Sequence, residues 1–480
     1  MVIKMENAER VLHYFSEISR IPRESGDEQG ISDYLVSFAK EHKLEFLRDA
    51  HLNVIIKKPA TIANCTCAPV IIQGHVDMVY VREEGCTRPY EDGIALLEKD
   101  GWITADGTTL GADNGFAVAY ALALLESKDI KHPDLEAVFT VSEEVGLIGA
   151  EMLDCTPLKG KYFLNLDSEQ EGVFVTSCAG ATRNELKLPV WREAVSNCVP
   201  LTIHIGGLRG GHSGIEINTG RANAITLMGR VLAALDDKIH LCKLSSSGKM
   251  NAIANNAEAL VFVNSTHLNA VEAIIQDMEK VFKHELLGRD EVSISAACGA
   301  VCDASCYTEK SRKTAVNALI LLPSGIVAMS HNIDGLVETS ANPGYIENDE
   351  NYLIIHSSVR SSVGSRKSEL VEHYAAIASL CGGESSCFGD YPQWEYRANS
   401  PLRELAMDTY RELFKKEPIA TALHAGLECG FFDMRIEGLD LISFGPDQKG
   451  VHTPEECANI ASIENVWKLI LRLLERLGSK

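Results

Sequence analysis

The sequence predicts an α/β protein, with one domain built on a mostly parallel sheet and an α+β domain inserted into it. Three observations point to this class. Short apolar segments alternate with segments of helical periodicity, three apolar segments before residue 170 end in a histidine or an acid, and the alternation changes character between about 186 and 396. Because alternating strands and helices form parallel sheets whose sites lie beyond the carboxyl ends of the strands, these polar residues are candidates for one site.

Length and composition limit the class of protein. The chain has 480 residues, more than one hydrophobic core usually holds, so at least two domains are expected. Its 45 Lys and Arg against 67 Asp and Glu give a formal charge of −22, which argues against nucleic-acid binding. No segment approaches ~20 consecutive apolar residues and no signal peptide is evident, so we expect no membrane association and a cytoplasmic location. In that reducing compartment the 14 cysteines are expected to be free thiols.

The first domain begins with alternating helices and buried strands. The expected helices are 6–19, 27–43 and a long apolar helix from Asp113 to about Glu126, and the expected strands are 51–57, 69–74, 135–142 and 161–166. After residue 397 the pattern resumes with a helix at 401–415, a strand at 439–445 and a helix at 462–477. We therefore assign 1–185 and 397–480 to this domain.

Residues 186–396 are expected to form the inserted domain. Its expected helices lie near 218–236, 268–284, 310–321 and 366–381, and its expected strands near 199–206, 258–264, 291–297, 326–332 and 352–359. The order of these elements indicates two consecutive, similar α+β units of about a hundred residues each.

The polar residues that follow the strands of the first domain, or begin its long helix, indicate a site for metal ions. They are His75, Asp77, Asp113, Glu143, Glu144, Asp167 and His452. Two imidazoles with several carboxylates and no cysteine suit Zn, Mn or Co. So many carboxylates in one crevice need cations to offset their repulsion, which predicts two divalent ions and a hydrolase. The alternative is that these acids are separately solvated, or cap helices as Asp113 could.

Several motifs carry a resemblance to a known family. They are His75-x-Asp77, Gly111-Ala-Asp-Asn-Gly115, Glu143-Glu144, Asn165-Leu-Asp-Ser-Glu169, Gly210-Gly-His-Ser-Gly214 and His452-Thr-Pro-Glu. Together they resemble the di-zinc exopeptidases that include carboxypeptidase G, aminoacylases and carnosinases. The His424-Ala-Gly-Leu-Glu428 block and the long insertion resemble, within that family, the bacterial aminoacyl-histidine dipeptidases.

The resemblance implies roles for the residues of the first domain, which would be the catalytic domain. His75 and Asp167 would bind one ion, Glu144 and His452 the other, and Asp113 would bridge both. Asp77 would orient His75, and Glu143 would be the general base. The peptide bond between Asp113 and Asn114 would be cis.

The resemblance also implies that the inserted domain is a lid. His212 would stabilise the oxyanion, either within its own chain or from a partner subunit of a homodimer. Asn251, Arg360 and Gly426 would hold the C-terminal carboxylate of the substrate, for which the planar guanidinium of Arg is well suited.

Three functions are compatible with these residues. The first is a dipeptidase with two divalent ions, zinc foremost and Mn or Co as alternatives, which acts on unblocked dipeptides including Xaa-His dipeptides such as carnosine. The second is an amidase or deacylase of N-acyl amino acids on the same site. The third is a binding protein that keeps the fold without catalysis.

Overall fold

The computed structural model describes residues 8–479, which form two compact units. Unit 1 contains the described residues up to Cys178, Tyr396–Ala422 and the described residues from Leu427 onward. Unit 2 contains Ala179–Glu395 and the short segment Leu423–Gly426. The chain thus passes between the units near residues 178 and 395, where the sequence predicts boundaries near 185 and 396, and a later segment of four residues returns to unit 2.

Unit 1 is built on an eight-stranded mixed sheet. The strand order is β1 (Glu45–Arg48), β2 (Val54–Lys58), β6 (Leu135–Thr140), β3 (Val70–His75), β7 (Tyr162–Asn165), β20 (Asp440–Ser443), β8 (Val173–Cys178) and β19 (Ile419–Leu423). The four central strands β6, β3, β7 and β20 are parallel to one another, but β1 with β2, β2 with β6 and β20 with β8 are antiparallel pairs. The sheet is therefore mixed, and the prediction of a mostly parallel sheet is wrong for these three pairs. One reason is the short loop between β1 and β2, because a parallel pair needs a long crossover.

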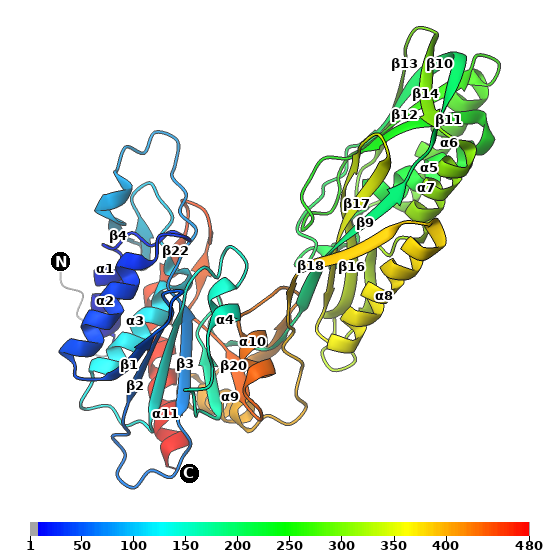
Figure 1. Ribbon diagram of the computed structural model, residues 1–480. Coiled ribbons are helices and arrows are strands. Elements are labelled where there is room, and N and C mark those ends of the chain that lie inside the picture. Colours follow the sequence, from blue (N-terminus) through cyan, green and yellow to red (C-terminus); the bar gives the residue numbers. More distant parts are fainter. Residues whose placement is uncertain (1–7, 480) are drawn as a thin grey trace. The chain divides into compact units, whose positions relative to one another are not determined.

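The helices of unit 1 pack around this sheet. They are α1 (Glu9–Ile18), α2 (Gln29–Glu41), α3 (Ala112–Glu126), α4 (Ile148–Met152), α9 (Pro401–Phe414), α10 (Cys429–Arg435) and α11 (Ile460–Gly478). In α3 every residue except Asp113 and Glu126 is buried, as expected for a helix that is apolar all round. One core joins residues of α1, α2, α3 and α11 to the sheet (Figure 1). Among residues 8–479, no helix combines the length and apolar character that crossing a bilayer requires.

Two local features of unit 1 place residues of the candidate site. A β-carbon on Gly74 would overlap Ala117 Cβ and Asn114 Oδ1, so glycine allows β3 to approach the start of α3 closely. A small sheet made of β21 (Gln448–Lys449), β22 (Cys457–Asn459), β5 (Trp102–Ala105) and β4 (Leu96–Lys99) holds the loop that contains His452. His75, Asp113 and His452 are thereby positioned by separate segments.

Unit 2 contains two antiparallel sheets. The first consists of β10 (Arg192–Gly206), β11 (Ile239–Ser245), β12 (Ala257–Asn264), β13 (Ser293–Cys298) and β14 (Cys302–Tyr307). The second has the order β15 (Gly325–Met329), β16 (Val337–Asn348), β17 (Tyr352–Ser361), β9 (Gly180–Pro189) and β18 (Glu384–Tyr391). The helices α5 (Ala224–Leu235), α6 (Leu268–Glu285), α7 (Glu309–Leu321) and α8 (Gly364–Cys381) lie along one side of these sheets (Figure 1).

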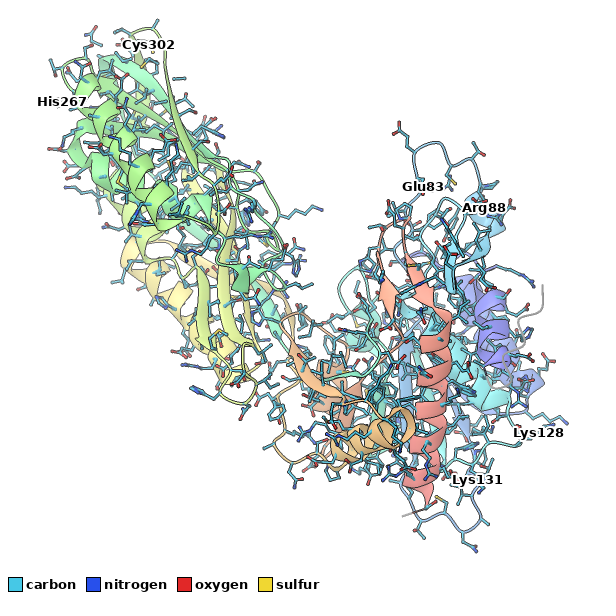
Figure 2. The ribbon with its side chains drawn as sticks, turned by 180° about the vertical axis from the view of Figure 1, so that it is seen from behind. Glu83, Arg88, Lys128, Lys131, His267 and Cys302 are labelled. Carbon is cyan, nitrogen blue, oxygen red and sulfur yellow. The ribbon has the colours of Figure 1, made fainter. Side chains whose placement is uncertain are left out.

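The two sheets of unit 2 are not consecutive in the sequence. Strand β9 comes before β10 in the chain, yet it pairs with β17 and β18 in the second sheet. The prediction of two consecutive units is therefore wrong, because one strand of the second sheet precedes the whole first sheet. Figure 2 shows this unit from behind, with His267, just before α6, and Cys302, the first residue of β14, near one end.

Candidate metal centre

The candidate ligands of unit 1 meet at the carboxyl ends of adjacent parallel strands. β3 pairs with β6 on one side and with β7 on the other, so their ends lie side by side. His75 ends β3, the pair Glu143 and Glu144 follows β6, and Asp167 follows β7. Asp113 lies in the first turn of α3, and His452 lies in the loop between β21 and β22.

Asp113 lies between two histidines. Its Oδ1 is 3.2 Å from His75 Nε2, and its Oδ2 is 3.4 Å from His452 Nε2. On the first side, Asp167 Oδ1 is 3.7 Å from His75 Nε2. On the second side, Glu144 Oε1 is 2.9 Å from His452 Nε2. Two sets of three residues each bring one ligand atom per residue within 4.8 Å of one another. The first set is His75, Asp113 and Asp167, and the second is Asp113, Glu144 and His452.

The tautomer of His75 supports a metal ligand at Nε2. Its Nδ1 lies 3.1 Å from the backbone oxygen of Asp77, which can only accept a hydrogen bond, so Nδ1 carries the proton and donates it. In the neutral ring Nε2 is then an acceptor, and it faces the carboxylate oxygens of Asp113 and Asp167. Acceptors that face one another need a proton or a cation between them, and a divalent ion fits this position.

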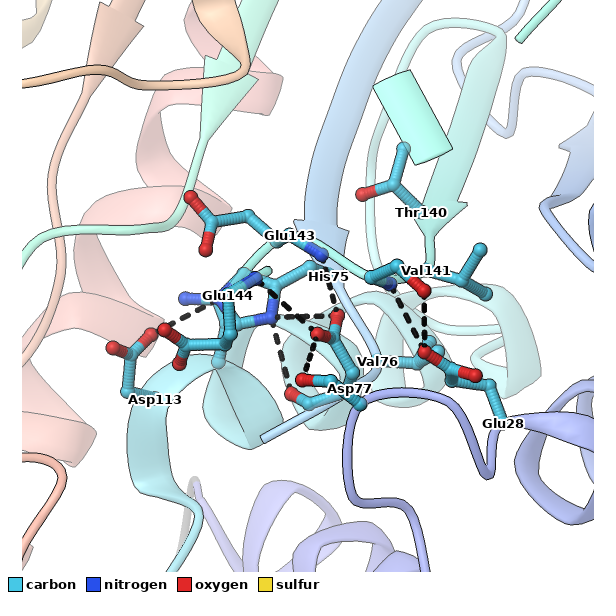
Figure 3. A network of polar contacts seen from close by, with 12 residues as sticks. Glu28, His75, Val76, Asp77, Asp113, Thr140, Val141, Glu143 and Glu144 are labelled. Atoms are coloured by element: carbon cyan, nitrogen blue, oxygen red, sulfur yellow. Dashed lines mark hydrogen bonds and ion pairs between the residues drawn. The ribbon is translucent and has the colours of Figure 1, made fainter. Parts of the chain in front are cut away.

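Asp77 also positions the two glutamates that follow β6 (Figure 3). Its Oδ1 accepts the N–H of Glu143 at 3.0 Å, and its Oδ2 accepts the N–H of Glu144 at 3.3 Å. The hydroxyl of Ser25 donates to the same carboxylate at 2.7 Å. The side chain of Asp77 is fully buried, so it contributes by holding other groups in place.

The protonation equilibria reflect the crowding of carboxylates. Burial raises the pKa of Glu143 to about 8; His75 opposes this shift, and the neighbouring carboxylates, led by Glu428, reinforce it. Burial, followed by the charge of Asp113, raises the pKa of Asp167 well above its ordinary value. Hydrogen bonds to Asp113 and Glu144 raise the pKa of His452 to about 10. These three shifts favour the protonated forms. Asp113 differs: burial opposes its ionisation, but hydrogen bonds with His452 and His75 hold its pKa below the ordinary value.

The residue types fit divalent ions of the zinc class. Imidazole nitrogen and carboxylate oxygen are ligands for Zn and also for Mn and Co, and no cysteine takes part. Glu143 belongs to a further group with His75 and Glu144, so its side chain is also within reach of an ion. The Asp113–Asn114 peptide is cis, which confirms the prediction from the resemblance.

Two buried charged residues that the sequence analysis did not identify hold the backbone of this site. The carboxylate of Glu456 accepts the N–H groups of Leu110, Gly111, Ala112 and Asp113 at 2.8, 2.9, 2.8 and 3.3 Å. The guanidinium of Arg23 donates to the carbonyls of Val76, Asp77 and Gly111 at 2.9, 3.3 and 2.5 Å. They fix the segments that carry Asp113 and Asp77.

Two further acids support the strand ends. Glu28 accepts the N–H and hydroxyl of Ser142 at 3.1 and 2.8 Å, directly before the glutamate pair (Figure 3). Glu428 is fully buried and accepts hydrogen bonds from Gln73 and Thr140, which lie near the ends of β3 and β6. Glu428 belongs to the His424–Glu428 block of the sequence, and that block is the signal that could have indicated it.

The residues predicted in the inserted domain also converge, within unit 2. A β-carbon on Gly214 would lie 2.5 Å from His424 O, 3.0 Å from His212 Cε1 and 3.3 Å from Arg360 Nε, so these residues surround it. One at Gly426 would lie 2.7 Å from the ring of Tyr391, whose hydroxyl accepts a hydrogen bond from Arg360 at 2.9 Å. Asn251 joins the group through its backbone, because its carbonyl accepts the N–H of Ser213 at 2.8 Å.

The tautomer of His212 places a donor, Nε2–H, where no hydrogen bond to it is found among the described residues. Its Nδ1 accepts the N–H groups of Gly214 and Ile215 at 3.2 and 3.1 Å, so the proton of the neutral ring is on Nε2. Burial, followed by the charge of Arg360, lowers the pKa of His212 and favours this neutral form. His424, which the sequence analysis did not single out as a site residue, places Nε2 2.7 Å from the hydroxyl of Ser340. Burial, again followed by Arg360, lowers its pKa to about 3.

Comparisons with known proteins extend over nearly the whole chain. The model of "Peptidase family M20/M25/M40" matches residues 71–476. The cytosol non-specific dipeptidase of Escherichia coli (strain K12) is 34% identical over 470 residues, which cover 97% of each chain. The crystal structure of aminoacylhistidine dipeptidase from Vibrio alginolyticus has a TM-score of 0.91 and 34% identity, and the match covers 98% of this chain and 96% of that one. A tripeptidase from Staphylococcus aureus shares the fold, with a TM-score of 0.58 at 17% identity and 99% of each chain covered.

The hydrogen bonds of Glu456 predict a specific defect in metal binding. We expect Glu456→Gln to weaken Zn²⁺ binding by ~10- to 100-fold, because an amide has one acceptor oxygen for N–H groups that now share two. Titration of metal-free protein with Zn²⁺ measures this directly. Glu464→Gln is the control, because it removes the same charge from a partly exposed i,i+4 pair with Lys468, away from the segments that Glu456 holds. Equal Zn²⁺ affinity of the two variants would contradict the role of Glu456.

Proposed function

The chain belongs to peptidase family M20/M25/M40, and we propose that it is a dipeptidase that uses two divalent metal ions to hydrolyse unblocked dipeptides. The observation that carries this proposal is the position of Asp113, whose two carboxylate oxygens face His75 and His452 from separate segments of the chain. The names of the relatives from E. coli and V. alginolyticus support dipeptides as substrates. The name of the former also supports the expected cytoplasmic location.

Two groups of residues would hold the ions. His75 and Asp167 would bind one, Glu144 and His452 the other, and Asp113 would contribute one oxygen to each. When bound, such ions lower the pKa of water and polarise a carbonyl group. Zinc is our first choice from the ligand types, with Mn and Co as alternatives.

Glu143 is the residue we assign to proton transfer. Its backbone is fixed by Asp77, and its side chain lies among the ligands. It would take a proton from the attacking water while the oxygen of that water bonds to the peptide carbon. It would then give the proton to the amine nitrogen as the carbon–nitrogen bond breaks, so that the products are two amino acids.

Residues of unit 2 would recognise the substrate. The Nε2–H of His212 can donate to the carbonyl oxygen as negative charge develops there. Arg360 can bind the C-terminal carboxylate, because its Nε has no hydrogen-bond partner within the described residues although it is buried. Asn251 and Gly426 complete the predicted carboxylate site.

Hydrolysis of a dipeptide panel tests the proposed function. We expect unblocked dipeptides, including carnosine and other Xaa-His dipeptides, to be cleaved in the presence of Zn²⁺, Mn²⁺ or Co²⁺. We also expect activity to be lost with a chelator, and elemental analysis to find about two ions per chain. N-acetylated dipeptides should be poor substrates. Preferential cleavage of N-acyl amino acids would instead establish the amidase alternative, and metal-independent hydrolysis would contradict the metal centre.

The adjacent glutamates should respond differently to substitution. Glu143→Gln should retain both ions and lower kcat by at least ~10², because the proton acceptor is lost while the ligands remain. Glu144→Gln should lose bound metal as well, because Glu144 lies with Asp113 and His452. Metal content and kcat of both variants give the answer. Loss of metal from Glu143→Gln would show that Glu143 is a ligand.

Substitution of Arg360 tests recognition of the carboxylate. We expect Arg360→Ala to raise KM for dipeptides by at least ~10-fold, and the unmodified enzyme to hydrolyse dipeptide amides poorly, because both changes remove the same charge pair. Arg366→Ala is the control, since Arg366 is partly exposed and pairs with Glu369 on α8. Equal cleavage of a dipeptide and its amide would exclude this role.

A further inference from the structure

We propose that unit 2 has a second ligand site, separate from the carboxylate site around Arg360, which binds a small organic anion that carries a planar ring. The site is a cavity of about 790 Å³ between the loop Ser246–Asn251 and the second sheet. Its volume is within the range of small-molecule sites. Arg183, Lys249, Tyr345, His356 and Phe388 line the cavity, together with the acid Glu347 and with Asn251, which we also assign to the carboxylate site. The proposal does not depend on the peptidase reaction.

Strand register explains why these side chains share one face. In one row across the sheet, Tyr345 of β16 pairs with His356 of β17. In another row, Arg183 of β9 pairs with Ser358 of β17 on one side and with Phe388 of β18 on the other. The alternate residues Leu353, Ile355 and Val359 belong to the core that also contains Leu370, Tyr374 and Ile377 of α8. Helix α8 therefore covers the opposite face of these strands.

The same register separates this cavity from Arg360. His356 and Arg360 lie four residues apart on β17, which is about 13 Å in an extended strand. A fully extended dipeptide spans only ~7 Å. The backbone of a dipeptide held by its carboxylate at Arg360 therefore does not reach the Tyr345–His356 pair. Binding to Arg360→Ala distinguishes a second molecule from the side chain of a bound dipeptide.

The charges of the cavity indicate an anion. The exposed cations Arg183 and Lys249 outnumber the one acid of its lining, Glu347, and neither has an ion pair with an acid of the described chain. A carboxylate or a phosphate would provide the missing partner.

The aromatic groups indicate a planar ring. The rings of Tyr345 and His356 are stacked, with centroids 4.2 Å apart and planes 16° from parallel. Phe388 also lines the cavity and is 43% exposed, so its ring has a free face. An aromatic ring that stacks on such a face gains dispersion and quadrupole interactions that a saturated ring lacks.

His356 supplies independent support for a missing ligand. Its side chain is buried, and neither ring nitrogen has a hydrogen bond within the described residues. The nearest carboxylate oxygens, of Glu347 and Glu185, are 3.4 and 3.9 Å from its ring nitrogens, which is too long for a strong hydrogen bond. Buried polar groups usually have a partner, and a ligand in this cavity would provide one.

Matched pairs of probes test the proposal by isothermal titration calorimetry with the metal-loaded, full-length protein. The first pair is phenylacetate and cyclohexylacetate, two carboxylates of which only the former has a planar ring. The second pair is AMP and ribose 5-phosphate, two phosphates of which only the former carries an aromatic base. We expect the aromatic member of one pair to bind with a Kd of about 1 mM or lower and at least ~10-fold more tightly than its partner. The pair that binds identifies the anion as a carboxylate or a phosphate. Absence of this preference in both pairs would overturn the proposal.

Variants locate the binding. Arg183→Gln and Lys249→Gln should each weaken binding of the aromatic probe by at least ~5-fold, and Phe388→Ala should abolish the preference for the aromatic ring. Lys280→Gln, an exposed cation paired with Asp277 on α6, and Arg360→Ala should leave the affinity unchanged. Since Arg183, Lys249 and Phe388 are exposed, these variants should fold, and thermal melts check this. Unchanged binding to both cation variants, or loss of binding in Arg360→Ala, would refute a separate site.

Discussion

The structure of unit 1 depends on the concentration of negative charge at one edge of its sheet. Asp113, Asp167, Glu143 and Glu144 lie around His75 and His452. Burial raises the pKa values of Glu143 and Asp167, whereas hydrogen bonds with the two histidines hold the pKa of Asp113 low against the effect of burial. Buried carboxylates repel one another strongly in a medium of low dielectric constant. Two protons on imidazoles reduce that repulsion only in part, whereas two divalent ions would remove it. The fold therefore holds the ligands in an arrangement whose stability is linked to cation binding.

A site of this kind needs a rigid backbone, because the ligands repel one another and would separate if their segments could move. The structure meets this need with charged side chains that bind main-chain groups. Glu456 holds the start of α3, Arg23 holds carbonyls beside Asp77 and Asp113, and Asp77 holds both glutamates. These contacts fix position without adding ligands. These contacts also explain why charged side chains are buried beside a cluster that already has excess negative charge. Each of them can make several charge-assisted hydrogen bonds to backbone groups, which offset the cost of burying its charge.

Sequence reasoning located the centre of unit 1 well because its strands are apolar throughout. The predicted strands 69–74, 135–142 and 161–166 correspond to β3, β6 and β7 within about two residues. Other strands have no such pattern: β18 is an exposed edge strand with Ser, Gly and Asp, and β16 contains Pro343 and Gly344 at a bulge. The residues proposed as ligands could be identified from the sequence because each follows a recognisable strand or motif. Arg23 and Glu456 could not, because a side chain that binds backbone groups far along the chain leaves no periodic signal.

Strand β17 shows how an antiparallel sheet combines a core with binding groups. Its period of two places Leu353, Ile355 and Val359 against α8 and leaves His356, Ser358 and Arg360 on the other face. A substitution on the second face would alter the proposed ligand contacts without enlarging the core between this strand and α8. The neighbouring strands contribute Arg183, Tyr345 and Phe388 to that face by the same rule. The sheet can therefore change its ligand chemistry row by row, while the helix-covered face keeps the fold of unit 2.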